Sequence, residues 1–246
     1  MTDFFTGVYN RLELFGGLHL TLSAVFIAAA VALYLLRERL KAAGGKRAVR
    51  LAMAWILAAN MLIHYSSKII LGIWRFDADL PFHLCFITNF FMIYILLSDN
   101  RGGLYRIIYF FTFIGPLPAM IWPDLDYSWE SYTFYQFIIS HHVMLLCSLY
   151  CLFVLEYDVP ARSVIPAFLY GNALVAAMAV FNSIFGTNYI MMTELPEQLY
   201  EVYPFLSALP PVFWLELVGI LAILASYIPA LMRKNTKGGS DKPAEA

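Results

Sequence analysis

A chain of 246 residues that is 61% hydrophobic and only 13% charged has the composition of an integral membrane protein, because soluble domains carry roughly a quarter charged residues. The mean hydropathy of +0.69 agrees with this class. A formal net charge of −1 without a basic stripe argues against a partner that is a nucleic acid. Three cysteines, all inside apolar segments, are too few for a disulfide framework.

Seven apolar stretches are long enough to cross a membrane, which takes about 20 mostly apolar residues in a helix. In chain order they are Gly17–Leu36, Leu51–Trp74, Leu80–Leu97, Tyr105–Trp122, Phe134–Leu155, Ser163–Phe185 and Pro210–Met232. The first is interpreted as an anchor, because no basic region precedes it as in a cleaved signal peptide. The sequence predicts an all-α bundle of seven transmembrane helices over residues 1–232. A polar tail over residues 233–246 is predicted to be disordered and cytoplasmic.

The loops between these stretches alternate in charge. The segment RERLKAAGGKRAVR follows the first stretch, and further arginines and lysines follow the third, fifth and seventh. The intervening loops contain FDAD, PDLDYSWE and MMTELPEQLYE and are acidic. Because positively charged loops stay in the cytoplasm, we expect the N-terminus outside and the C-terminus inside a cell membrane.

Polar side chains within the predicted helices gather at one depth, in the outer half of the bundle. Such groups are costly in lipid and usually face the bundle interior or a wet cavity. At 1.5 Å per residue, the thiol and the ionisable members lie roughly 8–15 Å from the outer ends of their helices. The members of this polar layer are His64, Lys68, Cys85, Asn89, His141, Asn182 and Glu216.

Each member of the polar layer also has a simpler structural interpretation. Lys68 is near enough to the outer surface to extend its amine to water, or it lines one cavity with His64, four residues away on the same helical face. Glu216 could be the partner of Lys68 or of a histidine, because buried charges are normally paired. Asn89 and Asn182 could simply form hydrogen bonds to neighbouring helices.

The motif LPFHLC introduces a candidate nucleophile, Cys85. A buried thiol resists ionisation unless a base or cation is close, and a histidine from another helix is the usual partner. Pro81 suits the first turn of a helix and Asp79 suits the position before it. We therefore expect helical geometry to begin before His83, which would point His83 and Cys85 to nearly opposite sides.

The fifth stretch is then the expected source of a base. Its adjacent histidines, His141 and His142, point about 100° apart in a helix, so both are not expected to reach one centre. Cys147 and Cys151, four residues apart, are interpreted as small packing residues. Suitably spaced ligands are too few for zinc, and we predict neither a metal site nor a cofactor.

Three motifs carry a family resemblance: LPFHLC, SHH at Ser140–His142 and FNSIFGTNYIMM at Phe181–Met192. They resemble the bacterial YwaF-type integral membrane proteins, seven-helix proteins without an established function, which typically read LPLHLC, SHG and GTNYMYL at these places. His142 therefore replaces a usual glycine, and Ile190–Met192 differ conservatively. The resemblance covers nearly the whole chain except the tail.

The YwaF group is in turn distantly similar to a eukaryotic transmembrane acyltransferase that builds polyunsaturated ether phospholipids. Lipid hydrolases of the androgen-induced-gene type, which use a threonine and a histidine, are remoter still. The distant resemblance implies that Cys85 is the acyl-accepting nucleophile and His141 the general base. It further implies that Asn188 and Tyr189 lie at the mouth of the site.

Two functional hypotheses follow. The first is a lipid acyltransferase or hydrolase acting on a phospholipid or lysophospholipid, with Asn89 or Asn188 as the oxyanion donor. The alternative is a non-enzymatic transporter, sensor or binding protein that uses the same polar cavity. A retinal protein is excluded, because the seventh stretch has no lysine. The residues expected to bind the ligand are His64, Lys68, His83, Asn89, Asn182, Asn188, Tyr189 and Glu216.

Overall fold

A computed structural model describes residues 4–5, 11–98, 102–123, 125 and 129–238, with side chains as far as residue 233. Every regular element in this part of the chain is a helix, which confirms the predicted all-α class. The first half contains α2 (Gly17–Ala42), α3 (Lys46–Ile70), α4 (Leu84–Ser98), α5 (Gly103–Ile114) and α6 (Pro116–Ile121).

The second half begins with one rod in which α7 and α8 are joined by a π-helical turn. It continues with two long helices separated by short ones. Its elements are α7 (Tyr132–Ile138), η1 (Ile139–Val143), α8 (Met144–Phe153), η2 (Ala161–Ser163), α9 (Val164–Phe185), η3 (Tyr189–Met191), α10 (Glu197–Val202), η4 (Pro204–Ala208) and α11 (Pro211–Gly238).

Six helical segments in the described part of the chain are long and apolar enough to cross a membrane. The predicted span Leu80–Leu97 forms α4, which has 15 residues and covers about 22 Å at 1.5 Å per residue. This helix is shorter than the roughly 20 residues that a full crossing takes. The lengths therefore support six spans and one shorter apolar helix.

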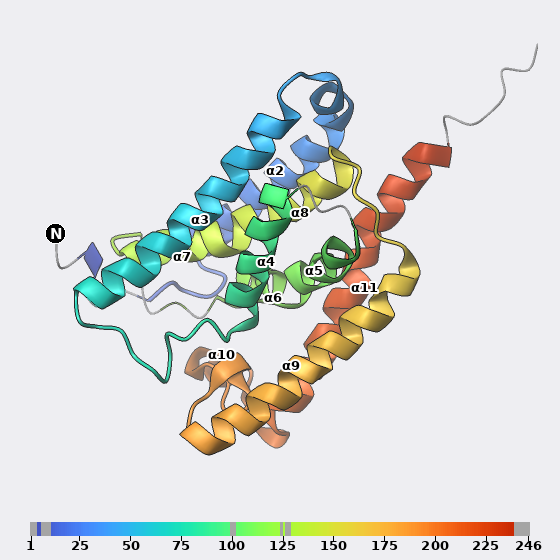
Figure 1. The fold of residues 1–246 in the computed structure, drawn as a ribbon. Coiled ribbons are helices and arrows are strands. Elements are labelled where there is room, and N and C mark those ends of the chain that lie inside the picture. Colours follow the sequence, from blue (N-terminus) through green and yellow to red (C-terminus); the bar gives the residue numbers. More distant parts are fainter. Residues whose placement is uncertain (1–3, 6–10, 99–101, 124, 126–128, 239–246) are drawn as a thin grey trace, which may run out of the picture.

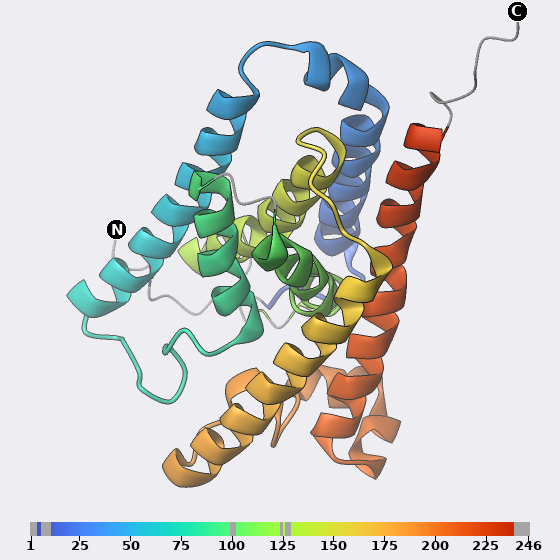
Figure 2. The same cartoon turned by 45° about the vertical axis from the view of Figure 1, so that its right-hand side comes forward.

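The rod α7–η1–α8 is the most buried of the membrane helices, and α5 is the next. The helices α4, α9 and α11 all pack against α5, while α3 packs against α4 and η1 (Figures 1 and 2). In contrast, few residues of α2, α9 and α11 are buried, so most of their apolar side chains are at least partly exposed. Such apolar outer faces are what a helix in contact with lipid requires.

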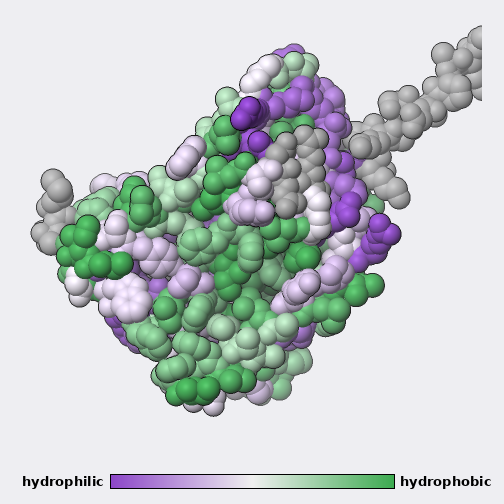
Figure 3. Space-filling model, viewed as in Figure 1, coloured by the Kyte–Doolittle hydropathy of each residue, from purple (hydrophilic) through white to green (hydrophobic). Residues whose placement is uncertain are grey.

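The basic loops come together at one end of the bundle. Figure 2 shows the α2–α3 turn, the α8–α9 loop and the C-terminal end of α11 at this end, with the 71–83 loop and α10 at the other. Ion pairs link neighbouring segments at this basic end. Lys41 pairs with Glu156 (3.4 Å), and Arg106 (3.1 Å) and Arg233 (3.5 Å) both pair with Asp158. Hydrophilic side chains gather there in Figure 3.

The start of α4 differs from the sequence expectation. The helix begins at Leu84, and Leu80–His83 form a turn, so the prediction that helical geometry starts before His83 was wrong. The carboxylate of Asp79 does not cap this helix. It forms an ion pair with Lys68 and accepts a hydrogen bond from the backbone N–H of Arg75 (2.8 Å).

The C-terminal helix also extends past a predicted boundary. Helix α11 continues from Pro211 to Gly238, although its apolar, membrane-length part ends at Arg233. Residues 234–238, which were predicted to belong to a disordered tail, are therefore helical. The remainder of the predicted tail, residues 239–246, lies outside the described residues.

Candidate functional site

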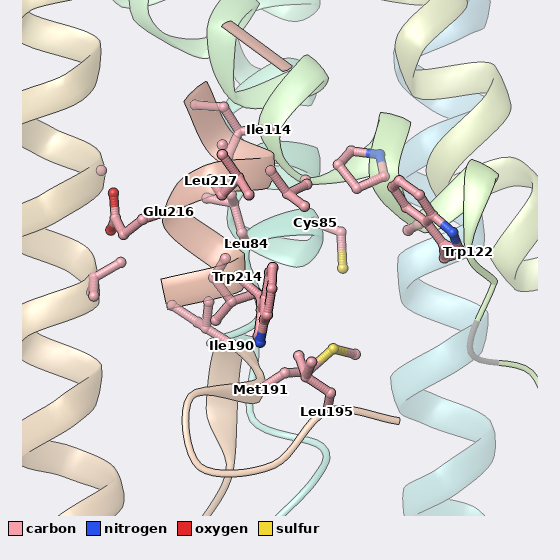
Figure 4. A pocket seen from close by; sticks show the side chains of 18 of the residues that line it. Leu84, Cys85, Ile114, Trp122, Ile190, Met191, Leu195, Trp214, Glu216 and Leu217 are labelled. Atoms are coloured by element: carbon pink, nitrogen blue, oxygen red, sulfur yellow. The ribbon is translucent and has the colours of Figure 1, made fainter. Parts of the chain in front are cut away.

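An apolar cavity of about 750 Å³ lies between the start of α4, the α5–α6 junction, the α7–η1 rod, α9 and α11. Residues of η3, α10 and η4 cover it at the end opposite the basic loops (Figures 2 and 4). Its volume is typical of small-molecule sites, which are mostly apolar with a few polar groups. Among the described lining residues, the side chains suited to nucleophilic or acid–base chemistry near neutral pH are His83, Cys85, His141 and Glu216.

Cys85 is the second residue of α4 and is partly exposed to this cavity. Figure 4 shows its sulfur directed into the space between Trp122 and the segment that carries Met191 and Leu195. Burial opposes ionisation of a thiol, but the positive end of a helix favours the thiolate. The position at the start of α4 therefore suits a nucleophile better than the middle of a helix would. In contrast, Cys147 is fully buried in the core.

His141 enters the cavity from the π-helical turn η1. Its ring Nδ1 lies 2.8 Å from the carbonyl oxygen of Phe137, and its ring stacks on that of Phe137 with centroids 4.1 Å apart. A carbonyl only accepts, so Nδ1–H is the donor, and the neutral ring keeps the lone pair of a base on Nε2. The neighbouring His142 packs edge-on against Phe26 and does not line the cavity.

The π-helical turn is supported by a buried polar network. Ser140 Oγ accepts hydrogen bonds from Asn60 Nδ2 (3.0 Å) and Gln136 Nε2 (2.7 Å), and the Ser140 carbonyl accepts one from Asn89 Nδ2 (3.3 Å). Single π-helical turns often occur at functional sites. Asn89 itself is fully buried and does not line the cavity, so it forms helix–helix contacts instead of facing a ligand.

The structure does not bring His64 and Lys68 to the cavity. His64 is buried and stacks on Phe86, with ring centroids 5.4 Å apart. Lys68 forms an ion pair with Asp79, and so Glu216 is not its partner. Glu216 does line the cavity, but Figure 4 shows its carboxylate directed toward α9 and away from Cys85.

The corrected start of α4 changes the interpretation of His83. Because His83 precedes the helix, it is not bound to the helical 100° spacing, and both His83 and Cys85 line the cavity. The ring of His83 lies beside that of Tyr189, with centroids 5.2 Å apart. The prediction that His83 and Cys85 point to nearly opposite sides was therefore wrong, because only Cys85 belongs to the helix.

The three residues predicted around GTNY build the connection after α9. Asn182 Nδ2 donates to the Tyr189 carbonyl (2.9 Å), while its Oδ1 accepts from Tyr189 N–H (2.9 Å) and Thr187 Oγ1 (2.7 Å). Asn188 Nδ2 donates to the Glu194 carbonyl (2.8 Å), so this amide already has a hydrogen-bond partner within the α9–α10 connection. Neither Asn188 nor Tyr189 lines the cavity.

Most of the residues that form the walls of the cavity were not predicted from the sequence. The side chains that reach it after Tyr189 are Ile190 and Met191, and both have positive φ angles (63° and 59°). Aromatic side chains close the covered end, where Trp122 Nε1 donates to the Tyr203 hydroxyl (3.4 Å). Their signal in the sequence was the enrichment of aromatic residues near helix ends, which does not say which of them share a cavity.

The apolar outer faces and the membrane-length helices define a multi-pass membrane protein. The chain belongs to the TMEM164 family, whose model matches residues 14–228. This range contains every element from α2 to η4 and most of α11. No curated protein and no solved structure matches the chain significantly.

Proposed function

We propose that this protein is a lipid acyltransferase or lipid hydrolase in which Cys85 is the nucleophile and His141 the general base. One observation carries the proposal: Cys85 and His141, from separate helices, line a single apolar cavity. The bond from His141 Nδ1–H to the Phe137 carbonyl supports the role of His141, because it leaves Nε2 to accept a proton.

The reaction begins with the ester of a phospholipid. Nε2 of His141 takes the thiol proton while Sγ of Cys85 attacks the carbonyl carbon, so that a C–S bond forms and the C–O bond to the glycerol breaks. The proton then passes from His141 to the departing alkoxide, which leaves as a lysolipid. A hydroxyl of a second lysolipid, or water, attacks the thioester and gives up its proton through His141 to the thiolate. The first acceptor gives transfer and the second gives hydrolysis.

The surroundings of the cavity favour a lipid as substrate. Its walls are aliphatic and aromatic, and α9 and α11, which flank it, expose apolar faces. An acyl chain loses no hydrogen bonds when it leaves the bilayer for such a cavity, whereas a polar metabolite does. Phospholipids and lysophospholipids are therefore the proposed substrates.

The proposal includes the position of the protein in the cell membrane. The basic end formed by the α2–α3 turn and the α8–α9 loop is cytoplasmic by the positive-inside rule, and the N-terminus is outside. Helix α4 is then the third of seven spans in chain order and is shorter than the other six, and the cavity opens in the outer half of the bundle. We also propose that the chain is of the bacterial YwaF type, on the strength of LPFHLC and GTNY.

The test is acyl transfer in nanodiscs containing a phosphatidylethanolamine with an alkyne-tagged acyl chain. Cys85→Ala is expected to abolish the hydroxylamine-sensitive tag on the protein and the formation of lysolipid, while the folded yield is kept. Cys147→Ala, which removes a thiol buried in the core, is the matched control and keeps both. Undiminished lysolipid formation by the Cys85→Ala protein would refute the proposal.

The alternative is a non-enzymatic lipid binder or transporter that uses the same cavity. It is favoured by the absence of a hydrogen bond between Cys85 and His141 among the described contacts. Binding or flux of the tagged lipid would then survive Cys85→Ser but fall with Glu216→Gln, which changes the only carboxylate among the described lining residues.

A further inference from the structure

Tyr189 connects two segments that are far apart in the sequence, the α9–α10 connection and the loop before α4. Its side chain is fully buried. We propose that Tyr189 is a positioning residue that fixes where His83 and Cys85 sit in the cavity. The inference deepens the proposed function, and rests on it, because it assumes that Cys85 is the reactive thiol.

Tyr189 is itself held firmly on the side of α9. Both its backbone N–H and its carbonyl bond to the side chain of Asn182, at 2.9 Å each. Asn182 lies in the last turn of α9 and is buried. The tyrosine is therefore fixed to the end of a long helix, so that its hydroxyl has a defined place.

The hydroxyl of Tyr189 contacts the loop before α4 twice. It donates to the carbonyl of Phe76 and accepts from the backbone N–H of Leu80 (3.0 Å). Burial raises the pKa of this phenol, so it stays protonated and remains a donor. The ring also packs against Phe82 (centroids 5.5 Å apart) and His83 (5.2 Å). One side chain thus contacts the loop at four of the eight residues from 76 to 83.

A second contact holds the same loop, from a different helix. Asp79, next to Leu80, forms an ion pair with Lys68 on α3. The loop is therefore clamped between α3 and η3, and only the residues from Pro81 to His83 separate the clamp from the first residue of α4. Little freedom is left for Cys85, the second residue of that helix.

The clamp opposes a competing conformation that the sequence itself favours. Pro81 is compatible with the first turn of a helix, so an unrestrained loop could extend α4 toward the N-terminus. In that extended helix His83 and Cys85 would lie about 200° apart and could not both face the cavity. The side chain of Asp79 is bonded to Lys68 and so does not cap such an extended helix, Leu80 is held by Tyr189, and the helix starts at Leu84.

The test compares Tyr189→Phe with Tyr200→Phe in full-length protein in phosphatidylethanolamine nanodiscs. The first variant keeps the ring and loses both bonds to the loop. The second loses a hydroxyl that accepts from the Leu195 N–H (3.3 Å) on the same side of the protein, without contacting the loop before α4. Loss of two hydrogen bonds is expected to speed amide exchange of residues 80–85 about tenfold in Tyr189→Phe, with no change there in Tyr200→Phe.

The kinetic readout is acyl-thioester formation on Cys85 from the alkyne-tagged phosphatidylethanolamine. In Tyr189→Phe we expect kcat to fall about tenfold while KM stays within about twofold, because the cavity walls that hold the acyl chain are kept. Unchanged exchange of residues 80–85 would overturn the inference, and so would faster exchange with an unchanged kcat. Failure of the proposed function is recognised separately, by lysolipid formation that persists in Cys85→Ala.

Discussion

The buried amide of Asn182 offers a sharp test of how the end of α9 is built. Asn182 is 4% exposed, and its side chain makes the three hydrogen bonds to Tyr189 and Thr187. Asn182→Leu keeps the approximate volume but leaves the N–H and carbonyl of Tyr189 without these partners. Each buried backbone group left unpaired costs about 1–3 kcal/mol, so we expect a loss of about 3 kcal/mol.

Asn172→Leu is the matched control on the same helix. Asn172 is exposed and lines the cavity, and its amide donates only to the carbonyl of Phe168, four residues earlier (3.0 Å). We expect this change to cost less than about 0.5 kcal/mol, as surface substitutions usually do. Thermal unfolding of the detergent-solubilised proteins measures the difference, and amide exchange of residues 186–195 locates it. Equal melting temperatures for the two variants would refute the reasoning.

Three further predictions concern charged groups and orientation. Lys68→Met leaves the carboxylate of Asp79, which is 5% exposed, without its ion-pair partner and should destabilise the protein by about 2 kcal/mol. Adding Asp79→Asn to the same chain should restore about half of that stability. Thermal shifts of the two single variants that simply add in the double variant would contradict the pairing. Asp158→Asn removes two exposed ion pairs with arginines and should cost under about 1 kcal/mol, with the small difference vanishing in high salt. Finally, cysteines introduced at the exposed positions Gly44 and Glu194 should react with a membrane-impermeant maleimide from opposite sides of the membrane. Glu194→Cys should be labelled in intact cells and Gly44→Cys only after lysis. Labelling of both variants in intact cells would contradict the proposed orientation.

Much of the architecture follows from the local chemistry of the chain. Long apolar stretches must satisfy their backbone hydrogen bonds internally in lipid, which leaves helices as the economical solution for this composition. For this reason the positions of the helices agree with the sequence prediction apart from their ends. The start of α4 was predicted too early because Pro81 and Asp79 fit a helix start, whereas in the structure Asp79 and Leu80 make long-range contacts instead.

The candidate site, like the fold, was predicted from the sequence only in part. The sequence identified Cys85 and His141 as residues of interest, and it limited the base to one of two adjacent histidines. The orientation of His141 depends on the π-helical turn, which a regular helical wheel does not anticipate. His64 and Asn89 were grouped with them by depth alone, because depth in a helix says nothing about which face meets the cavity.

The sequence by itself determined that this is an all-α membrane protein, because burial in lipid restricts which residues can occur where, and it predicted a layer of polar groups at one depth. Only the tertiary structure decided which of those groups share a cavity. Lys68 forms an ion pair with Asp79 and His64 stacks on Phe86, so neither lines the cavity. Tyr189, which was expected to contact a ligand, instead links the end of α9 to the loop before α4 through hydrogen bonds. Each outcome depends on a partner distant in sequence, and contacts of that kind exist only once the helices have packed.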